Sequence, residues 1–364
     1  MTSPPSPALS PALTRLLADF DARKPAALAR AVSLVENQRE GFDALLGVLH
    51  PRLGRAQRIG ITGPPGAGKS TLTTQLTRAY REAGLTVGIV AVDPTSPFTG
   101  GALLGDRIRM EDVALDPGVY IRSLATRGSL GGLSSATRVV ADVLDAYGFD
   151  RILMETVGVG QSELDIARAA ESTLVVLVPE SGDSIQTLKA GLMEIADLFA
   201  VNKADRPGAD RVRNDIELML GMRSGIAMRQ VPAHHGVDLA SINNPGKAAR
   251  EAARGDQQEQ WIPPVLRTVA AKGEGITELV DALDRHVRYL GASGELGRRR
   301  RARWREQILE VAEQRLRRRV WDDAGIRAFI DDALPAVEAG TSTPFGIADE
   351  LLRRGAGILT RTDP

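Results

Sequence analysis

The stretch that decides the fold runs from Gly63 to Thr71 and reads G-P-P-G-A-G-K-S-T. It satisfies the pattern G-x-x-x-x-G-K-[ST]. An apolar run containing Ile59 and Ile61 precedes it, and a stretch of helical spacing begins after it at Leu72. Glycines allow many backbone N–H groups to converge at a helix N-terminus, where the helix dipole favours anions. The stretch therefore predicts a phosphate-binding loop (P-loop) between a strand and a helix.

The same motif indicates which side chains touch a nucleotide. Lys69 would reach the β and γ phosphates, and the Ser70 hydroxyl would be a ligand of Mg²⁺. An ordinary glycine-rich turn is the alternative, but Lys-Ser-Thr in register after a strand disfavours it. The expected nucleotide-binding positions in this loop are Gly63, Gly66, Ala67, Gly68, Lys69, Ser70 and Thr71.

Short apolar runs alternate with longer amphipathic stretches through the middle of the chain. We expect strands at 58–62, 86–92, 119–124, 151–155, 172–178, 197–202 and 265–270. We expect helices at 69–83, 133–147, 184–196, 209–221 and 276–290. Such alternation is typical of an α/β fold, here a P-loop NTPase whose mainly parallel sheet is flanked by helices.

The two ends of the chain lack strand patterns. Apolar positions at helical spacing predict an N-terminal helical segment, and beyond Gly291 they predict helices at 298–320, 324–338 and 345–354. The apolar faces of the C-terminal helices must pack against the main domain or against a second copy of the chain. The expected regions are a disordered tail (1–11), the N-terminal helical segment (12–55), the P-loop domain (56–290) with a polar excursion (224–262), and a C-terminal helical dimerisation arm (291–364).

Composition excludes several classes of function. The 364 residues contain 46 basic and 46 acidic side chains and no cysteine. The charge balance gives no support for nucleic-acid binding, and without cysteine there is no disulfide, thiolate nucleophile or Cys-ligated metal. The segment from Met1 to Pro11 lacks the features of a secretory signal, and the apolar runs are too short to span a bilayer. We expect a cytoplasmic protein that binds neither nucleic acid nor membrane.

A second motif indicates which base is bound. Residues Asn202 to Asp205 read N-K-A-D, directly after an apolar run. A carboxylate at Asp205 can accept hydrogen bonds from guanine N1–H and N2–H₂, a donor pair that adenine lacks. Asn202 can brace the loop, and the stem of Lys203 can lie on the base; the alternative role for Asp205 is a helix N-cap. A second contact with the base is expected from Ala270, Ala271 and Lys272.

Three acidic residues follow the P-loop at strand ends or in loops. Asp93 and Glu155 end apolar runs, and Asp106 lies in the string G-G-A-L-L-G-D-R. Carboxylates near a phosphate-bound Mg²⁺ hold its water ligands, and the backbone N–H of Gly158 could bind the γ-phosphate. Each carboxylate could instead be a turn or cap residue. The expected metal-binding set is Ser70, Asp93, Asp106 and Glu155, and the expected catalytic set is Lys69, Asp93, Glu155 and Gly158.

Together these strings resemble one family. The combination of G-P-P-G-A-G-K-S-T, D-P-T-S-P-F-T-G-G-A-L-L-G-D-R-I-R-M, E-T-V-G-V-G-Q-S-E and N-K-A-D closely resembles the methylmalonyl-CoA mutase-associated GTPases. These are G-protein chaperones of a B12-dependent mutase, related to the human methylmalonic aciduria type A protein and also described as arginine/ornithine transport ATPases. The resemblance covers roughly residues 58–290, and it implies GTP and GDP binding, Mg²⁺, and a homodimer.

Carried over by position, the resemblance assigns nucleotide binding to Gly66 through Thr71 and to the N-K-A-D motif, and magnesium to the three carboxylates. It identifies residues 179–189 as a switch loop that signals nucleotide state to the mutase. Two departures stand out. The excursion at 224–262 is longer and more polar than expected, which puts the partner geometry in question. Ala270 stands where a serine is common, although a backbone N–H can do the same work.

The leading functional hypothesis is a chaperone whose GTP cycle gates the loading or protection of adenosylcobalamin in an acyl-CoA mutase. The chain lacks the D-x-H-x-x-G string of a cobalamin carrier. Its nearest string, D-R-H-V-R-Y, has Tyr289 where glycine is required, and it puts His286 on a predicted helix. The cobalamin site is therefore expected on a partner. Slow intrinsic GTP hydrolysis, raised by that partner, is also expected.

Two alternatives are a nickel-insertion GTPase and an ATP-using kinase or ATPase of an amino-acid (arginine/ornithine) transport system. A nickel-insertion protein needs Cys and His ligands, whereas this chain has no cysteine and four histidines. A transport kinase would need adenine recognition, which the N-K-A-D motif disfavours. Comparison of the affinities for ATP and GTP would separate the second alternative.

Overall fold

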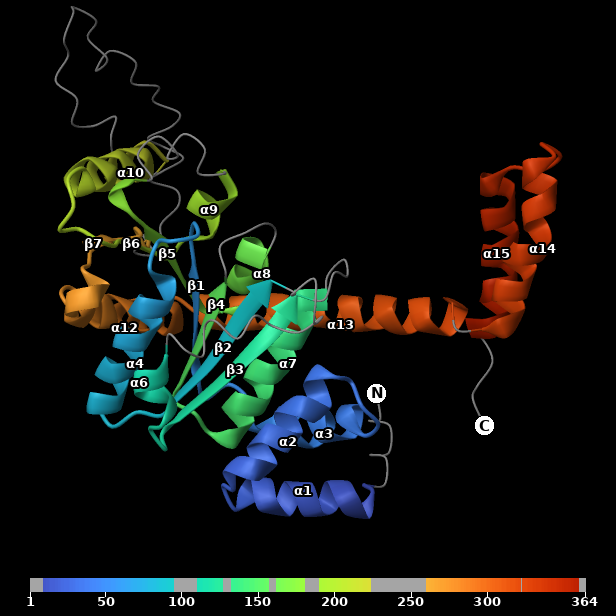
Figure 1. The fold of residues 1–364 in the computed structure, drawn as a ribbon, viewed down its shortest axis with the longest axis horizontal. Coiled ribbons are helices and arrows are strands. Elements are labelled where there is room, and N and C mark those ends of the chain that lie inside the picture. The colour runs from blue at the N-terminus through green and yellow to red at the C-terminus, as the bar shows by residue number, and fades with distance from the viewer. Residues whose placement is uncertain are drawn as a thin grey trace, which may run out of the picture. The chain divides into compact units, whose positions relative to one another are not determined.

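A seven-stranded sheet forms the centre of the fold (Figure 1). The computed structural model describes residues 9–94, 110–126, 132–156, 162–180, 190–223, 260–321 and 323–359. The strands lie in the order β3-β2-β4-β1-β5-β6-β7, and every neighbouring pair is parallel. Their bounds are β1 (Gln57–Thr62), β2 (Val87–Pro94), β3 (Val119–Thr126), β4 (Arg151–Thr156), β5 (Ser172–Leu177), β6 (Leu198–Val201) and β7 (Val265–Arg267).

Helices follow the strands and extend both ends of the chain. Those up to β4 are α1 (Pro11–Asp21), α2 (Pro25–Glu36), α3 (Phe42–Leu49), the 3-10 turn η1 (His50–Arg52), α4 (Lys69–Glu82), α6 (Glu111–Ala114) and α7 (Gly132–Tyr147). Those after β4 are α8 (Ser162–Ala169), α9 (Ala190–Ile195), α10 (Ala209–Arg223), the 3-10 turn η5 (Ala270–Lys272), α12 (Ile276–Ala292), α13 (Glu295–Trp321), α14 (Ala324–Glu338) and α15 (Pro344–Leu359).

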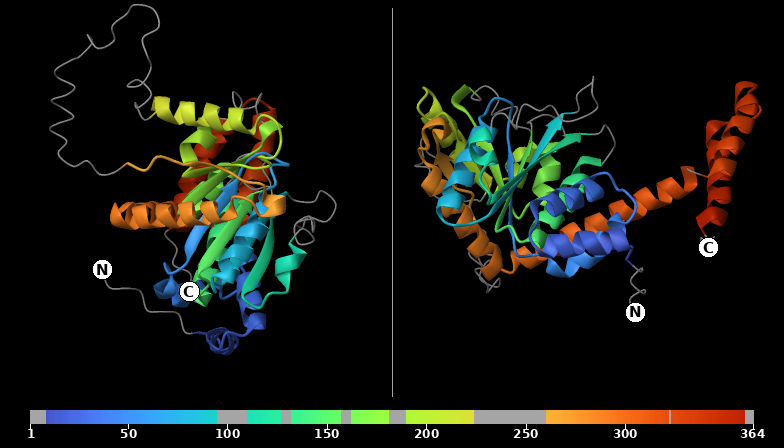
Figure 2. Two further views of the ribbon diagram at one scale, coloured as in Figure 1. Left: turned by 90° about the vertical axis from the view of Figure 1, so that its left-hand side faces the viewer. Right: turned by 60° about the horizontal axis from the view of Figure 1, so that its bottom comes forward.

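The strands are apolar on both sides because helices cover both faces of the sheet. On one face α4, α6 and α12 pack over β-strand residues such as Ile59, Ile61 and Leu174. On the other face α7 and α8 pack over Ile152 and Met154. Figure 2 shows the sheet between these two layers of helices.

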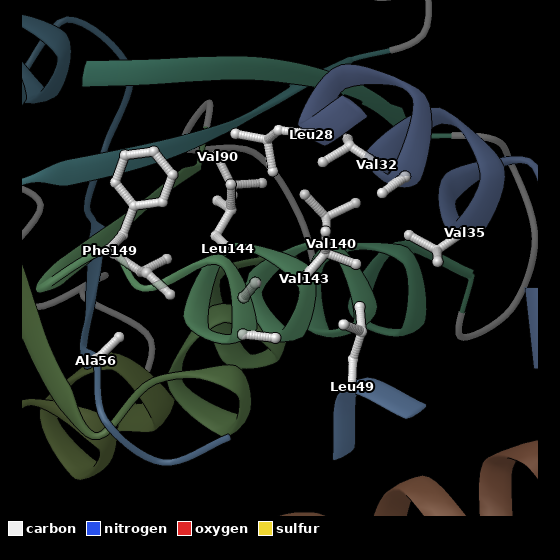
Figure 3. Packing of buried hydrophobic residues seen from close by; sticks show 14 of the residues in the cluster. Leu28, Val32, Val35, Leu49, Ala56, Val90, Val140, Val143, Leu144 and Phe149 are labelled. Atoms are coloured by element: carbon white, nitrogen blue, oxygen red, sulfur yellow. The ribbon is translucent and has the colours of Figure 1, made fainter. Parts of the chain in front are cut away.

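The N-terminal helices join the second of these layers. Leu28, Val32 and Val35 of α2 are buried against Val140 and Leu144 of α7 (Figure 3). Burial of one such side chain stabilises a fold by roughly 1.5–3 kcal/mol, so this contact holds the N-terminal segment on the P-loop domain.

Helix α8 lies unusually close to the sheet where it crosses β1. A Cβ at Gly60 would lie 2.6 Å from the Ile166 side chain and 3.1 Å from that of Ala170. Any residue larger than glycine would push α8 outward. The close approach fixes the helix that follows β4 against the strand that leads into the P-loop.

The chain divides into two compact units, Met1–Arg300 and Arg301–Pro364. The first contains the sheet, its covering helices and the beginning of α13 (295–300). The second contains the rest of α13 with α14 and α15, and α14 begins at the N-cap Asp323, whose carboxylate accepts a hydrogen bond from Ile326 N–H. Across the described residues, no helix is long and apolar enough to cross a membrane.

The expected α/β class and the seven strands are confirmed, with three local differences. The last strand ends at Arg267, three residues early, because Val269 pairs with Glu274 and the chain turns through η5 between them. Helix α8 and the short α6 were not expected; the first turn of α8 is too polar to show a clear apolar periodicity. Most of the excursion at 224–262 and residues 1–8 of the tail lie outside the described residues.

Candidate nucleotide-binding site

The predicted site residues converge at one edge of the sheet. In a parallel sheet all strands end on the same side, and ligands bind in the crevice outside those ends. The P-loop follows β1, Glu155 lies at the end of β4, and the N-K-A-D motif follows β6. Asp93 lies in β2, two residues after Ala91, whose register partner on β4 is Glu155. Asp106 and Gly158 lie outside the described residues.

Neighbouring segments lie so close to two P-loop positions that only glycine fits there. Gly63 has a φ of 137°, and a Cβ there would lie 2.1 Å from the Val176 carbonyl oxygen. Gly68 has a φ of 84°, and a Cβ there would lie 2.5 Å from the Asn202 side-chain nitrogen. Both positions combine a left-handed backbone with no room for a side chain. The loop can therefore pack against β5 and against the N-K-A-D segment at the same time.

The ammonium group of Lys69 lies inside the P-loop. Its Nζ donates hydrogen bonds to the carbonyl oxygens of Gly63, at 2.9 Å, and Pro64, at 3.0 Å. The side chain is buried although it carries a charge. The Lys69 ammonium group therefore places a positive charge within the P-loop, directly before α4. Polyphosphate binding requires such a charge.

Ser70 and Glu155 are brought together although 85 positions separate them in the chain. Ser70 Oγ donates to Glu155 Oε1 at 2.6 Å, and Thr73 Oγ1 lies 2.8 Å from Glu155 Oε2. Glu155 is almost completely buried. A hydroxyl and a carboxylate are the hard oxygen donors that Mg²⁺ prefers, and the donors present here fit that ion.

Asn202 joins three segments of the site. Its Nδ2 donates to the Ala67 carbonyl at 2.8 Å, and its Oδ1 accepts from Ala270 N–H at 3.0 Å and from Thr268 Oγ1 at 3.2 Å. The side chain is buried, so each of these groups satisfies another that water cannot reach. Asn202 thus fixes the P-loop and the loop after β7 relative to β6.

The remaining members of the predicted base site lie nearer the surface. Lys203 adopts a left-handed backbone, with a φ of 53°, and its Nζ donates to the Gly66 carbonyl at 2.8 Å. The Asp205 carboxylate is 43% exposed and lies 3.3 Å from Lys272 Nζ. Ala270 is buried, and Ala271 and Thr71 are exposed.

Comparison with known proteins agrees with this geometry. The family described as Methylmalonyl Co-A mutase-associated GTPase MeaB matches residues 28–325. The chain belongs to this family. Membership means that the chain is a GTPase-family protein and implies that it binds a guanine nucleotide.

Individual relatives cover nearly the whole chain. A Pyrococcus abyssi protein named as a GTPase is 44% identical over 335 residues, which is 91% of this chain and 94% of the relative. The mouse methylmalonic aciduria type A homolog is 32% identical and covers 90% of this chain and 76% of its own. A crystal structure titled LAO/AO transport system kinase superposes with a TM-score of 0.61, at 25% identity, over 97% of this chain and 100% of that one.

Two hydroxyl groups of the candidate site were not anticipated from the sequence. Thr73 contacts Glu155, and Thr268 contacts Asn202. Thr73 stands three residues after Ser70 on the same helix, so the S-x-x-T spacing was a signal that both hydroxyls share one face. The contact of Thr268 with Asn202 could not be predicted from a local pattern, because the two residues lie 66 positions apart in the chain.

His286 is a residue of helix α12, as predicted, and it is fully buried. Its Nδ1 lies 2.8 Å from Ser172 Oγ, and its Nε2 lies 3.3 Å from Asp197 Oδ1. Arg299 binds the same Asp197 carboxylate through two nitrogens, at 2.8 and 2.9 Å. This polar cluster lies at the starts of β5 and β6, at the opposite edge of the sheet from the nucleotide site. It fastens the beginning of α13 to the sheet within the first unit.

Proposed function

We propose that this protein hydrolyses GTP with Mg²⁺ and uses the cycle to chaperone a B12-dependent acyl-CoA mutase of the methylmalonyl-CoA mutase type. The observation that carries the nucleotide part is the position of Asn202 between Ala67 and Ala270. This side chain ties the phosphate-binding loop to the base-binding loops. The two loops that it connects would hold the phosphates and the base of one nucleotide.

The phosphate half of the proposal assigns roles to the P-loop. Its backbone N–H groups bind the β-phosphate, and the Lys69 ammonium moves from the Gly63 and Pro64 carbonyls to the β and γ phosphates. Ser70, together with Glu155, Asp93 and Asp106, would hold a magnesium ion. When bound, that ion neutralises the charge that develops on the phosphates. Gly158 is assigned to the γ-phosphate as the group that senses hydrolysis.

The base half assigns guanine to Asp205. Its ion pair with Lys272 is largely exposed and therefore contributes little, about 0–1 kcal/mol, so the carboxylate can turn to guanine N1–H and N2–H₂ at small cost. The stem of Lys203 lies along the base while its Nζ stays on the Gly66 carbonyl. Ala270, Ala271 and Lys272 close the other side of the base.

Calorimetry with GDP, GTP, ADP and ATP tests the nucleotide part. We expect tight, Mg²⁺-dependent binding of both guanine nucleotides and weak binding of both adenine nucleotides. Phosphate release from GTP, measured alone and with a mutase, tests whether hydrolysis is slow until the partner is present. Preference for ATP would reject the guanine assignment and favour a transport kinase.

The chaperone part is supported by family membership and by the description of that family. We infer a homodimer that works in the cytoplasm and contacts its mutase through residues 179–189. Its test is the transfer of adenosylcobalamin into purified methylmalonyl-CoA mutase, followed by absorbance, in the presence of GTP, GDP or no nucleotide. Transfer that is independent of this protein and of the nucleotide would reject the chaperone role.

A further inference from the structure

The Glu155 carboxylate is held by two hydroxyl groups of one helix. Ser70 Oγ lies 2.6 Å from Oε1, and Thr73 Oγ1 lies 2.8 Å from Oε2. Thr73 is fully buried and Glu155 nearly so. The two oxygens of the carboxylate therefore have different neighbours: one faces the start of α4, where the P-loop ends, and the other faces the body of the helix.

Thr73 has a second acceptor within reach. Its Oγ1 also lies 3.0 Å from the Lys69 carbonyl, one turn earlier, which is the usual acceptor for a threonine inside a helix. A hydroxyl has one proton to donate, and an ionised carboxylate is the stronger acceptor. The shorter distance to Glu155 agrees with this preference. Thr73 thus does more than satisfy its own helix.

We propose that Thr73 is a positioning residue that fixes the orientation of Glu155 and so presents its Oε1 to Ser70 and the magnesium shell. The inference rests on the magnesium-nucleotide part of the proposed function. Rotation about the last bond of a glutamate side chain is broad. A hydrogen bond from the Thr73 hydroxyl to Oε2 narrows this rotation before the metal arrives.

Magnesium is sensitive to such an arrangement. It demands nearly ideal octahedral geometry and keeps several waters, whereas Ca²⁺ accepts a range of coordination numbers and one or two oxygens from each carboxylate. Without Thr73 the Glu155 carboxylate loses the hydrogen bond on Oε2, so more of its orientation has to be fixed when the metal binds. The loss falls on Mg²⁺ more than on Ca²⁺, and this difference distinguishes positioning from general weakening of the site.

The test uses the full chain and a fluorescent GDP analogue, titrated with Mg²⁺ and separately with Ca²⁺. Thr73→Val removes the hydroxyl and keeps the shape of the side chain. We expect the Mg²⁺ concentration at half-maximal binding to rise about tenfold, as for loss of a hydrogen bond to a charged group. We expect the Ca²⁺ midpoint to change less than threefold. Thr73→Ser, which restores a hydroxyl, should recover most of the Mg²⁺ difference.

Thr77→Val is the matched control. Thr77 is also fully buried on α4, and its hydroxyl donates to the Thr73 carbonyl at 2.8 Å without contacting Glu155. The same isosteric change one turn later should leave both metal midpoints at the parent values. A Mg²⁺ shift in Thr77→Val equal to that in Thr73→Val would show that the cause is the helix and would reject the proposal.

Other results reject it as clearly. If Thr73→Val has the same Mg²⁺ midpoint as the parent, or if its Mg²⁺ and Ca²⁺ midpoints shift equally, Thr73 does not position Glu155 for magnesium. If circular dichroism shows that Thr73→Val is unfolded, Thr73→Ala is measured in its place. Failure of both to fold would make Thr73 a core residue only. If the parent itself binds no GDP with Mg²⁺, the proposed function fails, which is a different outcome from an unchanged midpoint.

Discussion

Asn202 and Ala67 lie 135 positions apart in the chain and are joined by a 2.8 Å hydrogen bond from Asn202 Nδ2 to the Ala67 carbonyl. The amide oxygen of Asn202 meanwhile accepts from Thr268 and Ala270. One buried side chain therefore holds together the loops that follow β1, β6 and β7. The relative position of the proposed phosphate and base subsites depends on it.

Asn202→Ala should weaken GDP binding by at least tenfold and lower the free energy of unfolding by about 2 kcal/mol, because it leaves buried partners unsatisfied. Calorimetry and urea denaturation measure the two effects. Asn214→Ala, at an exposed position of α10, is the control and should change neither quantity. Unchanged GDP affinity in the Asn202 variant would contradict the role of Asn202 in holding these loops in the geometry that binds nucleotide.

The sequence predicted the local parts of this site better than the contacts between them. The P-loop and N-K-A-D strings could be located because each is a continuous motif with a fixed backbone role. The sequence predicted that Asn202 braces its loop. It did not predict that the partners of Asn202 are Ala67 and Thr268, because these contacts depend on strand order. Strand order cannot be read from spacing along the chain. The exposure of Asp205 and its pairing with Lys272 likewise required the structure.

Lys69→Ala should abolish tight nucleotide binding, because it removes the ammonium group from the phosphate-binding loop. The fold should survive, since the carbonyls that Lys69 Nζ contacts, those of Gly63 and Pro64, belong to the same loop. Calorimetry with GDP checks binding, and circular dichroism checks folding. Lys24→Ala, at an exposed site on the N-terminal helices, is the control. GDP binding at parent affinity in Lys69→Ala would mean that the phosphates bind elsewhere.

Asp205→Asn should lower selectivity for guanine by a factor of ten or more. A side-chain NH₂ then faces guanine donors, and a lost charged hydrogen bond is worth about 1.5–3 kcal/mol. Xanthine nucleotides, which present a carbonyl at that edge, should bind better to the variant than to the parent. Competition of GDP, XDP and ADP against a fluorescent nucleotide gives the ratios. Asp215→Asn has nearly the same exposure and should leave them unchanged.

The environment of Asp145 leads us to expect that the free energy of unfolding falls at acid pH. Burial alone would raise its pKa, but the charge of Arg58 and hydrogen bonds from Ala56 and Gly54 N–H outweigh burial, so the pKa is lowered. The folded state therefore binds the proton more weakly than the unfolded chain. The stabilisation is complete above the ordinary aspartate pKa, near ~4, and is lost as pH falls through the lower folded value.

Asp145→Asn should remove this acid dependence and cost about 3 kcal/mol at neutral pH, because Arg58 stays buried with Asp142 as its remaining carboxylate partner. Urea denaturation between about pH 3 and pH 7 measures both effects. Asp21→Asn, which breaks an exposed ion pair with Arg52, is the control and should cost less than 1 kcal/mol. A neutral-pH loss no larger than the control's would contradict the assigned role of the Arg58 cluster.

The last prediction concerns where the chain can be cut. The second unit exposes large apolar side chains along α13, including Trp304, Ile308, Leu309 and Leu316. We expect these to be covered by a second copy of the chain, since closed two-fold symmetry buries the same surface twice. Sedimentation of the full chain as a monomer at micromolar concentration would contradict this.

Two truncations separate a dimerisation arm from a part of the core. A chain ending at Arg300 keeps the pairs of Arg299 with Asp197 and of Arg300 with Glu171. It should fold, bind GDP and sediment as a monomer. A chain ending at Gly291 loses both arginines and leaves the buried Asp197 carboxylate with the contacts to His286 and to the backbone N–H of Thr173. It should be less stable by about 3 kcal/mol. If the chain ending at Arg300 aggregated or remained a dimer, the arm assignment would be wrong.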